Sequence, residues 1–240
     1  MNQDPKSNLQ SLKSNRYPGR GICIGLDESG QTLLQVYWIM GRSANSRNRV
    51  FAAHGGTLRT EAANPSKVED PSLIIYNAML ETEGSYIVTN GDQTDTIFEA
   101  FADGSTFVQA LETREYEPDG PNFTPRISGM SLVDGEHIAT YLSVLKKSPF
   151  GDGCCRETFQ YESLPQGAGY TVTTYTGDGS PLPSFESEPY LLPLAGAPAV
   201  AASTIWRALD ADNRVSLAVK AIDLKSGASS IEVINAYEKV

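Results

Sequence analysis

Apolar residues recur along the chain in short runs and alternations that are typical of β-strands. Apolar runs at 22–26 and 33–40 flank a turn at 27–30, so this pattern predicts two strands joined by that turn. Further predicted hairpins are 50–53 with 57–62, 127–133 with 137–145, 157–162 with 170–175, and 214–223 with 230–237. Single strands are predicted at 72–80, where the apolar run is continuous, and at 86–89. The alternation within 170–175 indicates a strand that buries one face.

Two segments instead show the 3.6-residue period of a helix. The first spans 94–113 with an interruption near residue 103, and Asp92 or Thr94 is placed to cap its start. The second spans 199–209. Two other segments are predicted to be irregular: 116–126, which contains three prolines, and 177–198, which is rich in Gly, Pro and Ser and long enough to form an excursion or a lid.

The chain has 240 residues, of which 40% are hydrophobic, so it can bury a substantial core. It shows no internal repeat and no clear boundary, and we expect a polar leader over 1–15 followed by a single domain over 16–240. No segment approaches the roughly 20 apolar residues of a membrane span, and the leader lacks an apolar signal region. These features predict a soluble, cytoplasmic protein without a membrane partner.

Charge favours a small anionic ligand over a nucleic acid. The net charge is -10 and the pI is about 4.7, whereas nucleic-acid binding normally uses a broad basic face. Against this background Arg42, Arg47 and Arg49 lie within eight residues, directly after the apolar run that ends at Met40. Guanidinium groups grip phosphate or carboxylate in bidentate fashion, which predicts an anion-binding loop. The alternative is a solvated basic turn with ordinary surface ion pairs.

Cysteine and histidine give no sign of a metal site or of a disulfide framework. The cysteines are Cys23 and the adjacent pair Cys154 and Cys155, and His54 and His137 lie far apart in the sequence. This spacing fits neither a zinc site nor a set of disulfides. We therefore expect no metal and no cofactor.

Five motifs in order resemble the archaeal-type inosine monophosphate (IMP) cyclohydrolase family. They are Tyr-Pro-Gly-Arg-Gly (17–21), Tyr-Trp-Ile-Met-Gly-Arg-Ser-Ala-Asn-Ser-Arg-Asn-Arg (37–49), Ile-Tyr-Asn-Ala-Met (75–79), Val-Thr-Asn-Gly-Asp-Gln-Thr-Asp (88–95) and Asn-Phe-Thr-Pro-Arg-Ile (122–127). The resemblance implies an α+β fold, a four-layered αββα sandwich similar to N-terminal-nucleophile hydrolases. It also implies ring closure of 5-formamidoimidazole-4-carboxamide ribonucleotide (FAICAR) to IMP and water in purine biosynthesis. The segment after Ser148 adds little to the resemblance.

The implied reaction joins two groups of one substrate, so it requires orientation and proton transfer but no enzyme nucleophile, metal or cofactor. The resemblance assigns proton transfer to Tyr76 and Glu117, in either order, with Arg49 as a third catalytic group. The residues it implies for substrate binding are Arg20, Arg42, Ser46, Arg47, Asn77, Asn90, Asp92, Asp95, Asn122 and Arg126. Some family members carry a proline in the arginine loop where Arg47-Asn48-Arg49 stands here, so the arginine that meets the phosphate stays open.

Two other functions are compatible with the sequence. An N-terminal-nucleophile amide hydrolase would need a terminal Cys, Ser or Thr, which cleavage before Cys23 or a nearby Ser would create. Cys23 lies in an apolar run, where a structural thiol is the commoner reading. A non-catalytic module that binds a purine ribonucleotide would keep the arginines without using Tyr76 or Glu117. Homo-oligomerisation is compatible with each of these functions.

Overall fold

The computed structural model describes residues 3–68, 71, 74–135 and 137–239, and its strands form two antiparallel sheets. The six-stranded sheet has the order β11-β10-β1-β2-β12-β13, and the seven-stranded sheet runs from β3 to β9 in sequence order. The six-stranded sheet comprises β1 (Gly21–Leu26), β2 (Thr32–Met40), β10 (Ala168–Thr173), β11 (Tyr190–Pro193), β12 (Arg214–Asp223) and β13 (Ser229–Asn235). The seven-stranded sheet comprises β3 (Val50–His54), β4 (Thr57–Glu61), β5 (Asn77–Thr82), β6 (Ser85–Thr89), β7 (Arg126–Asp134), β8 (His137–Lys147) and β9 (Cys154–Tyr161).

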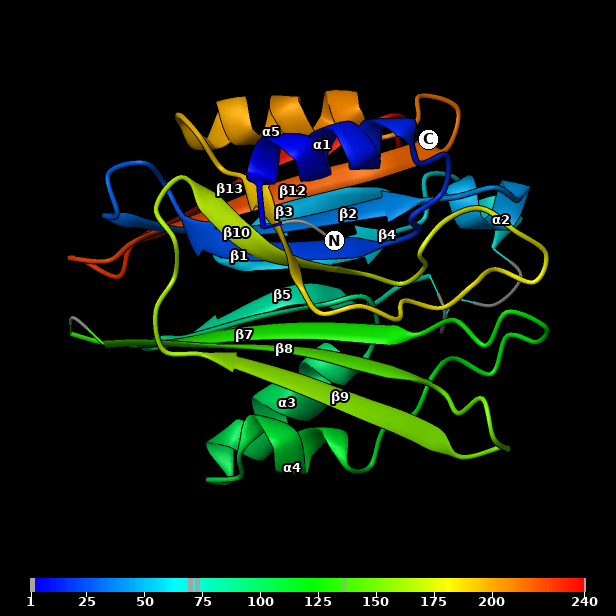
Figure 1. Cartoon of the computed structure of the whole chain (residues 1–240), viewed down its shortest axis with the longest axis horizontal. Helices are drawn as coiled ribbons and strands as arrows, with labels where there is room; N and C mark the ends of the chain where they lie inside the picture. Colours follow the sequence, from blue (N-terminus) through cyan, green and yellow to red (C-terminus); the bar gives the residue numbers. More distant parts are fainter. Residues whose placement is uncertain (1–2, 69–70, 72–73, 136, 240) are drawn as a thin grey trace.

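Helices cover the outer faces of both sheets (Figure 1). The described helices are α1 (Pro5–Ser14), α2 (Ala44–Arg47), α3 (Gln93–Ala102), α4 (Phe107–Leu111) and α5 (Pro198–Ala208), with a 3-10 turn at Pro65–Lys67. The short helix α2 lies at one end of the sheets. Figure 1 shows α1 and α5 over the six-stranded sheet, and α3 and α4 over the seven-stranded sheet. Among the described residues, no helix has the length and apolar character that crossing a membrane requires.

The two sheets face each other and bury the main core between them. Every residue of β1 is buried, as is every residue of β2 after Thr32, because these central strands are covered on both faces. Gly129 of β7 lies opposite β1, where an added Cβ would stand only 2.6 Å from Ile24 Cδ1. A glycine at this position therefore lets the sheets approach closely. The edge strand β13 alternates instead between half-buried and exposed residues.

The predicted hairpin of 157–162 with 170–175 is wrong. The two strands exist as β9 and β10, but β9 is the edge of the seven-stranded sheet and β10 lies between β1 and β11. The connection between them passes from one sheet to the other. For the same reason β10 does not bury one face alone: five of its six residues are buried.

The predicted strand over 72–80 is shorter than expected. Ser72 and Leu73 lie outside the described residues, and β5 begins only at Asn77. Tyr76 is buried just before the strand, with its backbone N–H donating to Thr60 Oγ1 at 3.0 Å and its carbonyl accepting from the backbone N–H of Thr60 at 2.9 Å.

Helix α1 was not predicted from the sequence, which indicated only a polar leader there. Asp4 caps the helix by accepting from the backbone N–H groups of Lys6 and Ser7, and Pro5 occupies the first turn. Leu12 is 3% exposed, and Asn8 Nδ2 donates to the carbonyl of Leu191 in β11 at 3.0 Å. These contacts fix the helix against the six-stranded sheet.

Candidate active site

A cavity of about 300 Å³ lies near α2, where loops from both sheets meet. It is lined by Tyr17, Gly19, Arg20, Met40, Arg42, Ser43, Asn45, Ser46, Arg49, Glu117, Asp119, Asn122, Thr124, Thr174, Tyr175 and Leu182. Among these are six of the predicted site residues: Arg20, Arg42, Ser46, Arg49, Glu117 and Asn122. The structure thus gathers the arginine loop, the segment before β1 and the loop before β7 around one space.

A buried ion pair joins the two sheets at the cavity. Arg20 precedes β1 and Glu117 precedes β7, with 2.8 Å between Nη1 and Oε1 and 2.9 Å between Nη2 and Oε2. Arg20 Nη1 also donates to the carbonyl of Asn90 at 2.9 Å. Burial alone would lower the pKa of Arg20, but the Glu117 carboxylate and the nearby phenols of Tyr76 and Tyr37 raise that pKa well above its ordinary value. Arg20 is therefore a permanent cation in the cavity wall.

Short polar contacts hold Glu117 and its proline-rich loop. The backbone N–H of Glu117 donates to the carbonyl of Thr124 at 2.9 Å, and Asp119 accepts from the Thr124 backbone N–H at 2.6 Å. The hydroxyls of Thr124 and Tyr175 lie 2.6 Å apart, which ties the loop to the end of β10. Burial raises the pKa of Asp119, although hydrogen bonds from Thr124 oppose the rise. These bonds give the loop a fixed shape without regular secondary structure.

Arg49 is a buried cation without a partner in the part of the chain that the structure describes. It is 9% exposed and lines the cavity, yet its side chain forms no hydrogen bond or ion pair there, and its Nε is fully buried. An unpaired buried charge is costly, so buried charges are normally paired or hydrogen-bonded. The guanidinium of Arg49 is thus suited to an anionic group of a ligand inside the cavity.

The other two arginines of the loop have protein partners. Arg42 lies at the mouth of the cavity, where Nη1 meets Asp178 Oδ1 at 2.5 Å and the guanidinium sits 4.9 Å from the centroid of the Tyr17 ring. Arg47 does not line the cavity: its Nε donates to the carbonyl of Gly41 at 2.9 Å, and its Nη2 donates to Asn213 Oδ1 at 3.3 Å.

Tyr76 lies in the same buried network but does not line the cavity. It is 4% exposed, and its hydroxyl is 2.7 Å from that of Tyr37 in β2. Both phenols are close enough to Arg20 to raise the pKa of its guanidinium. The pKa of Tyr37 is raised well above its ordinary value by burial and by Tyr76, so Tyr37 keeps its proton. Tyr37 was not predicted from the sequence.

The remaining predicted residues lie outside the lining of the cavity. Asn77 Nδ2 donates to Asp95 Oδ1 at 2.8 Å, and Asp92 forms ion pairs with Arg126, at 2.7 Å, and with Arg114. Asp92 stands at the start of α3 but makes no side-chain capping bond, contrary to one of the two caps considered. Asn90 Nδ2 donates to the carbonyl of Pro125 at 2.9 Å, and the carbonyl of Asn90 accepts from Arg20 Nη1. Asn90 therefore helps to position Arg20 in the cavity wall.

The model of the family described as IMP cyclohydrolase-like protein matches residues 17–227. The chain belongs to this family. Three curated archaeal IMP cyclohydrolases are similar to it. The protein of Methanothrix thermoacetophila is 33% identical over 118 residues, which is 48% of this chain and 57% of that protein. The proteins of Methanopyrus kandleri and Methanosphaera stadtmanae are each 28% identical, over 71% and 65% of this chain and 89% and 80% of their own lengths.

Several residues that line the cavity of this IMP cyclohydrolase-like chain were not predicted from the sequence. Asn45 lies within the arginine motif, and its buried Oδ1 has no hydrogen-bond partner among the described residues. Asp119 belongs to the proline-rich loop, and its place two residues after Glu117 was the available signal. Tyr175 and Leu182 come from the C-terminal third, where the sequence showed no motif. Across the described ranges, no cluster of three or more His, Cys, Asp or Glu side chains could hold a metal ion.

Proposed function

We propose that this chain is an IMP cyclohydrolase, an enzyme that closes the ring of FAICAR to form IMP and water in purine biosynthesis. One observation carries the proposal: the segment matched by the family, residues 17–227, contains every residue that lines the cavity. The cavity volume of about 300 Å³ falls at the lower end of the range for small-molecule sites.

The arrangement of the layers supports the finer part of the fold prediction. Helices, the six-stranded sheet, the seven-stranded sheet and further helices follow one another in Figure 1. We propose that this is a four-layered αββα sandwich similar to that of the N-terminal-nucleophile hydrolases.

The charges in the cavity suggest how the nucleotide is oriented. The 5'-phosphate would bind Arg49, because this buried guanidinium has no competing anion among the described residues. The base would then face the Arg20–Glu117 pair, which also lines the cavity. Asn45, with an unpaired buried amide oxygen, offers an acceptor for a substrate N–H or O–H group.

Ring closure places two demands on the residues beside the base. The carboxamide nitrogen attacks the formyl carbon and loses one proton. The formamido nitrogen loses a second proton as the C=N bond forms, and the formyl oxygen takes up two protons and leaves as water. Glu117 can accept the proton as the carboxylate of an ion pair, and Arg20 can stabilise negative charge on the formyl oxygen. Tyr76 remains the proposed proton donor: its hydroxyl lies 2.7 Å from that of Tyr37, and its phenol acts on the pKa of Arg20.

The test is an absorbance assay of IMP formation from FAICAR by the purified chain. Turnover would support the enzyme, whereas IMP binding without turnover would favour a nucleotide-binding module. The amide hydrolase alternative depends on cleavage before Cys23 or a nearby Ser, and the mass of the intact protein tests it. Cys23 is fully buried and burial raises its pKa to about 12, which disfavours a nucleophilic thiolate.

A further inference from the structure

The loop between β10 and β11 forms one wall of the cavity. Its Leu182 lines the space, and the backbone N–H of Leu182 donates to Asn122 Oδ1 at 3.1 Å. The base of the loop is anchored, since the N–H of Phe185 donates to the carbonyl of Thr174 at 3.1 Å and Lys146 Nζ donates to the carbonyl of Phe185 at 2.8 Å. The predicted substrate-binding residue Asn122 is thus in contact with this loop.

The tip of the same loop places a carboxylate on a cavity arginine. Asp178 Oδ1 lies 2.5 Å from Arg42 Nη1, and the same nitrogen donates to the carbonyl of Gly179 at 3.0 Å. Gly177 and Gly179 flank Asp178, which gives the backbone on both sides of the carboxylate more conformational freedom than other residues allow. The side chains of Arg42 and Asp178 are 38% and 39% exposed, so solvent screens the pair and an incoming anion can reach it.

The cavity arginines differ in whether a protein anion neutralises them. Arg20 forms a buried pair with Glu117, whereas Arg49 has no partner among the described residues. Arg42 is the intermediate case, with a partner that sits on a loop tip. All three arginines, together with Asp178, act on the pKa of the Tyr17 phenol, so their charges lie near one side chain of the cavity wall.

We propose that the Asp178 carboxylate competes with the phosphate of the nucleotide for Arg42. The phosphate must displace this carboxylate before it can bind both Arg42 and Arg49. Asp178 therefore sets the affinity of the site and its selectivity for phosphorylated ligands. This inference rests on the proposed function, because it assumes that the phosphate binds at the arginine loop.

Competition of this kind distinguishes a nucleotide from its nucleoside. A phosphate dianion carries more charge than a carboxylate and can form bidentate bonds with a guanidinium, so it can replace Asp178 on Arg42. A neutral nucleoside gains nothing from Arg42 and leaves the pair in place. Removing the charge of Asp178 should then strengthen nucleotide binding and leave nucleoside binding unchanged.

The experiment compares the affinities of the parent, Asp178→Asn and Glu186→Gln for IMP, inosine and inorganic phosphate by calorimetry. Glu186 is the matched control: it is exposed in the same loop, gives the same change in net charge, and has no ion pair among the described residues. Because exposed ion pairs are weak, we expect Asp178→Asn to bind IMP about two- to fivefold more tightly than Glu186→Gln does. Inosine should bind all three proteins alike, and thermal unfolding checks that each variant is folded.

A second comparison isolates the contact with Arg42. In an Arg42→Ala background, Asp178→Asn should bind IMP no more tightly than Glu186→Gln. Equal IMP affinities in the parent background, or weaker binding by Asp178→Asn, would overturn the competition and make Asp178 a support for the loop. Tighter inosine binding by Asp178→Asn would also contradict it.

The probes separate this inference from the proposed function. Turnover of FAICAR by the parent, with IMP and phosphate affinities that do not respond to Asp178→Asn, leaves the function standing and rejects the competition. Tighter phosphate binding by Asp178→Asn without IMP binding or turnover retains the competition and rejects the function. Failure of the parent to bind either anion rejects both.

Discussion

Arg49 combines burial with the lack of a protein partner among the described residues. Such a group lowers the stability of the fold, because these residues do not compensate the desolvation of the charge. Its retention in the cavity wall is readily explained if the compensation comes from a bound anion. Stability and affinity should therefore respond to substitution at this position in opposite directions.

Arg49→Met is expected to weaken IMP binding and to stabilise the free protein. A charge-assisted hydrogen bond is worth about 1.5–3 kcal/mol, so IMP affinity should fall at least about tenfold. Calorimetry measures the affinity, and thermal unfolding without ligand measures the stability. The control is Arg47→Met, which removes bonds to Gly41 and Asn213 outside the cavity lining and should mainly lower stability. Unchanged IMP affinity in Arg49→Met would remove Arg49 from the anion site.

Proton transfer is tested with Tyr76→Phe and Glu117→Gln. General acid–base assistance is worth about 10²–10⁴ in rate, and each variant should lose turnover of this order. Tyr76→Phe keeps the buried ring and loses one hydrogen bond to Tyr37, so its stability should fall by only about 1 kcal/mol. Turnover is measured with FAICAR and affinity with IMP. Near-parental rates in both folded variants would show that the chemistry lies elsewhere in the cavity.

The sequence predicted the arginine loop but not the different positions of its arginines. Ser43 and Ser46 form a capping box that starts α2. Because of this short helical turn, the side chains of Arg42, Arg47 and Arg49 have different surroundings. The final positions depend on partners that are distant in sequence, such as Asp178 for Arg42 and Asn213 for Arg47. Motif spacing contains no information about those partners.

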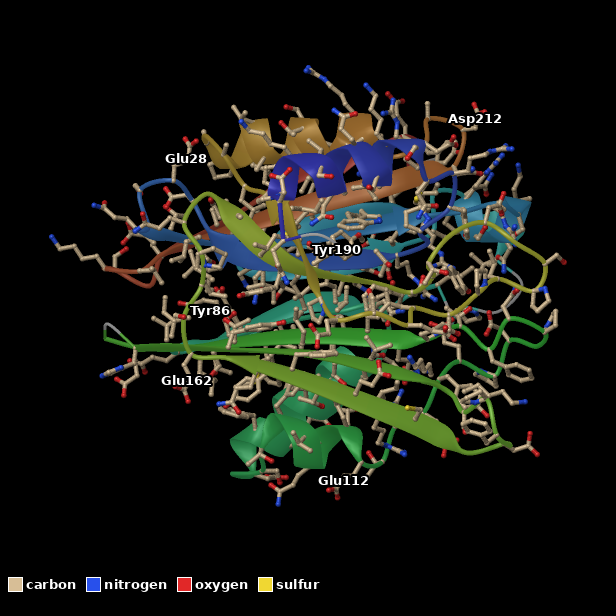
Figure 2. All side chains as sticks on the ribbon, in the orientation of Figure 1. Glu28, Tyr86, Glu112, Glu162, Tyr190 and Asp212 are labelled. Atoms are coloured by element: carbon tan, nitrogen blue, oxygen red, sulfur yellow. The ribbon has the colours of Figure 1, made fainter. Side chains whose placement is uncertain are left out.

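At the scale of the elements, a buried ion pair connects strands of the two sheets. Lys220 of β12 is fully buried and places Nζ 2.6 Å from Glu81 Oε2 of β5 and 2.7 Å from the carbonyl of Gly56. The Lys220 ammonium also lies 5.5 Å from the centroid of the Tyr86 ring, which is seen in Figure 2 at the end of the molecule opposite to α2 in Figure 1. The pair therefore links the sheets at the end remote from the cavity.

Removing either partner of this pair should lower the stability by a different amount. Glu81→Ala leaves a fully buried ammonium with one carbonyl partner, and loss of one partner of a buried pair costs about 3–5 kcal/mol. Lys220→Met should cost less, because the Glu81 side chain is 30% exposed and still accepts from Ser229 Oγ at 2.8 Å. Denaturant unfolding measures both variants. Equal losses would contradict the difference in burial on which the expectation rests.

The pH dependence of Glu81→Ala provides a further readout of the same pair. Burial lowers the pKa of Lys220, and Glu81 opposes that effect in the parent. Without Glu81 the folded-state pKa falls further, while the unfolded chain keeps a pKa of about 10.4. Between these two values the unfolded chain binds more protons, so the stability of the variant should rise as pH increases through this window.

Local patterns predicted the hairpins whose strands are joined by short turns, as in β1–β2, β3–β4, β7–β8 and β12–β13. They failed for β9 and β10, because a turn signal does not specify whether the next strand returns to the same sheet. Helix α1 was missed because only Leu9 and Leu12 mark its apolar face. Asp4 followed by Pro5 was the one local start signal.

For the molecule as a whole, the cavity belongs to neither sheet alone. Arg20 and Arg49 flank strands of different sheets, Glu117 precedes β7, and Tyr175 follows β10. The proposed catalytic groups therefore come together only when the sheets are packed face to face. Gly129, which lets the sheets approach closely, and the Arg20–Glu117 pair both contribute to that packing.

The order of the strands also has a consequence for folding during synthesis on the ribosome. Residues 50–161 supply all seven strands of one sheet, each beside its neighbour in sequence, whereas the other sheet joins β1 and β2 to strands from the last third of the chain. Since synthesis proceeds from the N-terminus and nearby strands pair fastest, we expect the seven-stranded sheet to form first. A stalled nascent chain with residues 1–161 exposed should protect the amides of β5 to β8 from exchange and yet bind no IMP. The capacity to bind nucleotide would then arise only after β10 to β12 have been synthesised, which limits the exposure of an incomplete site to metabolites.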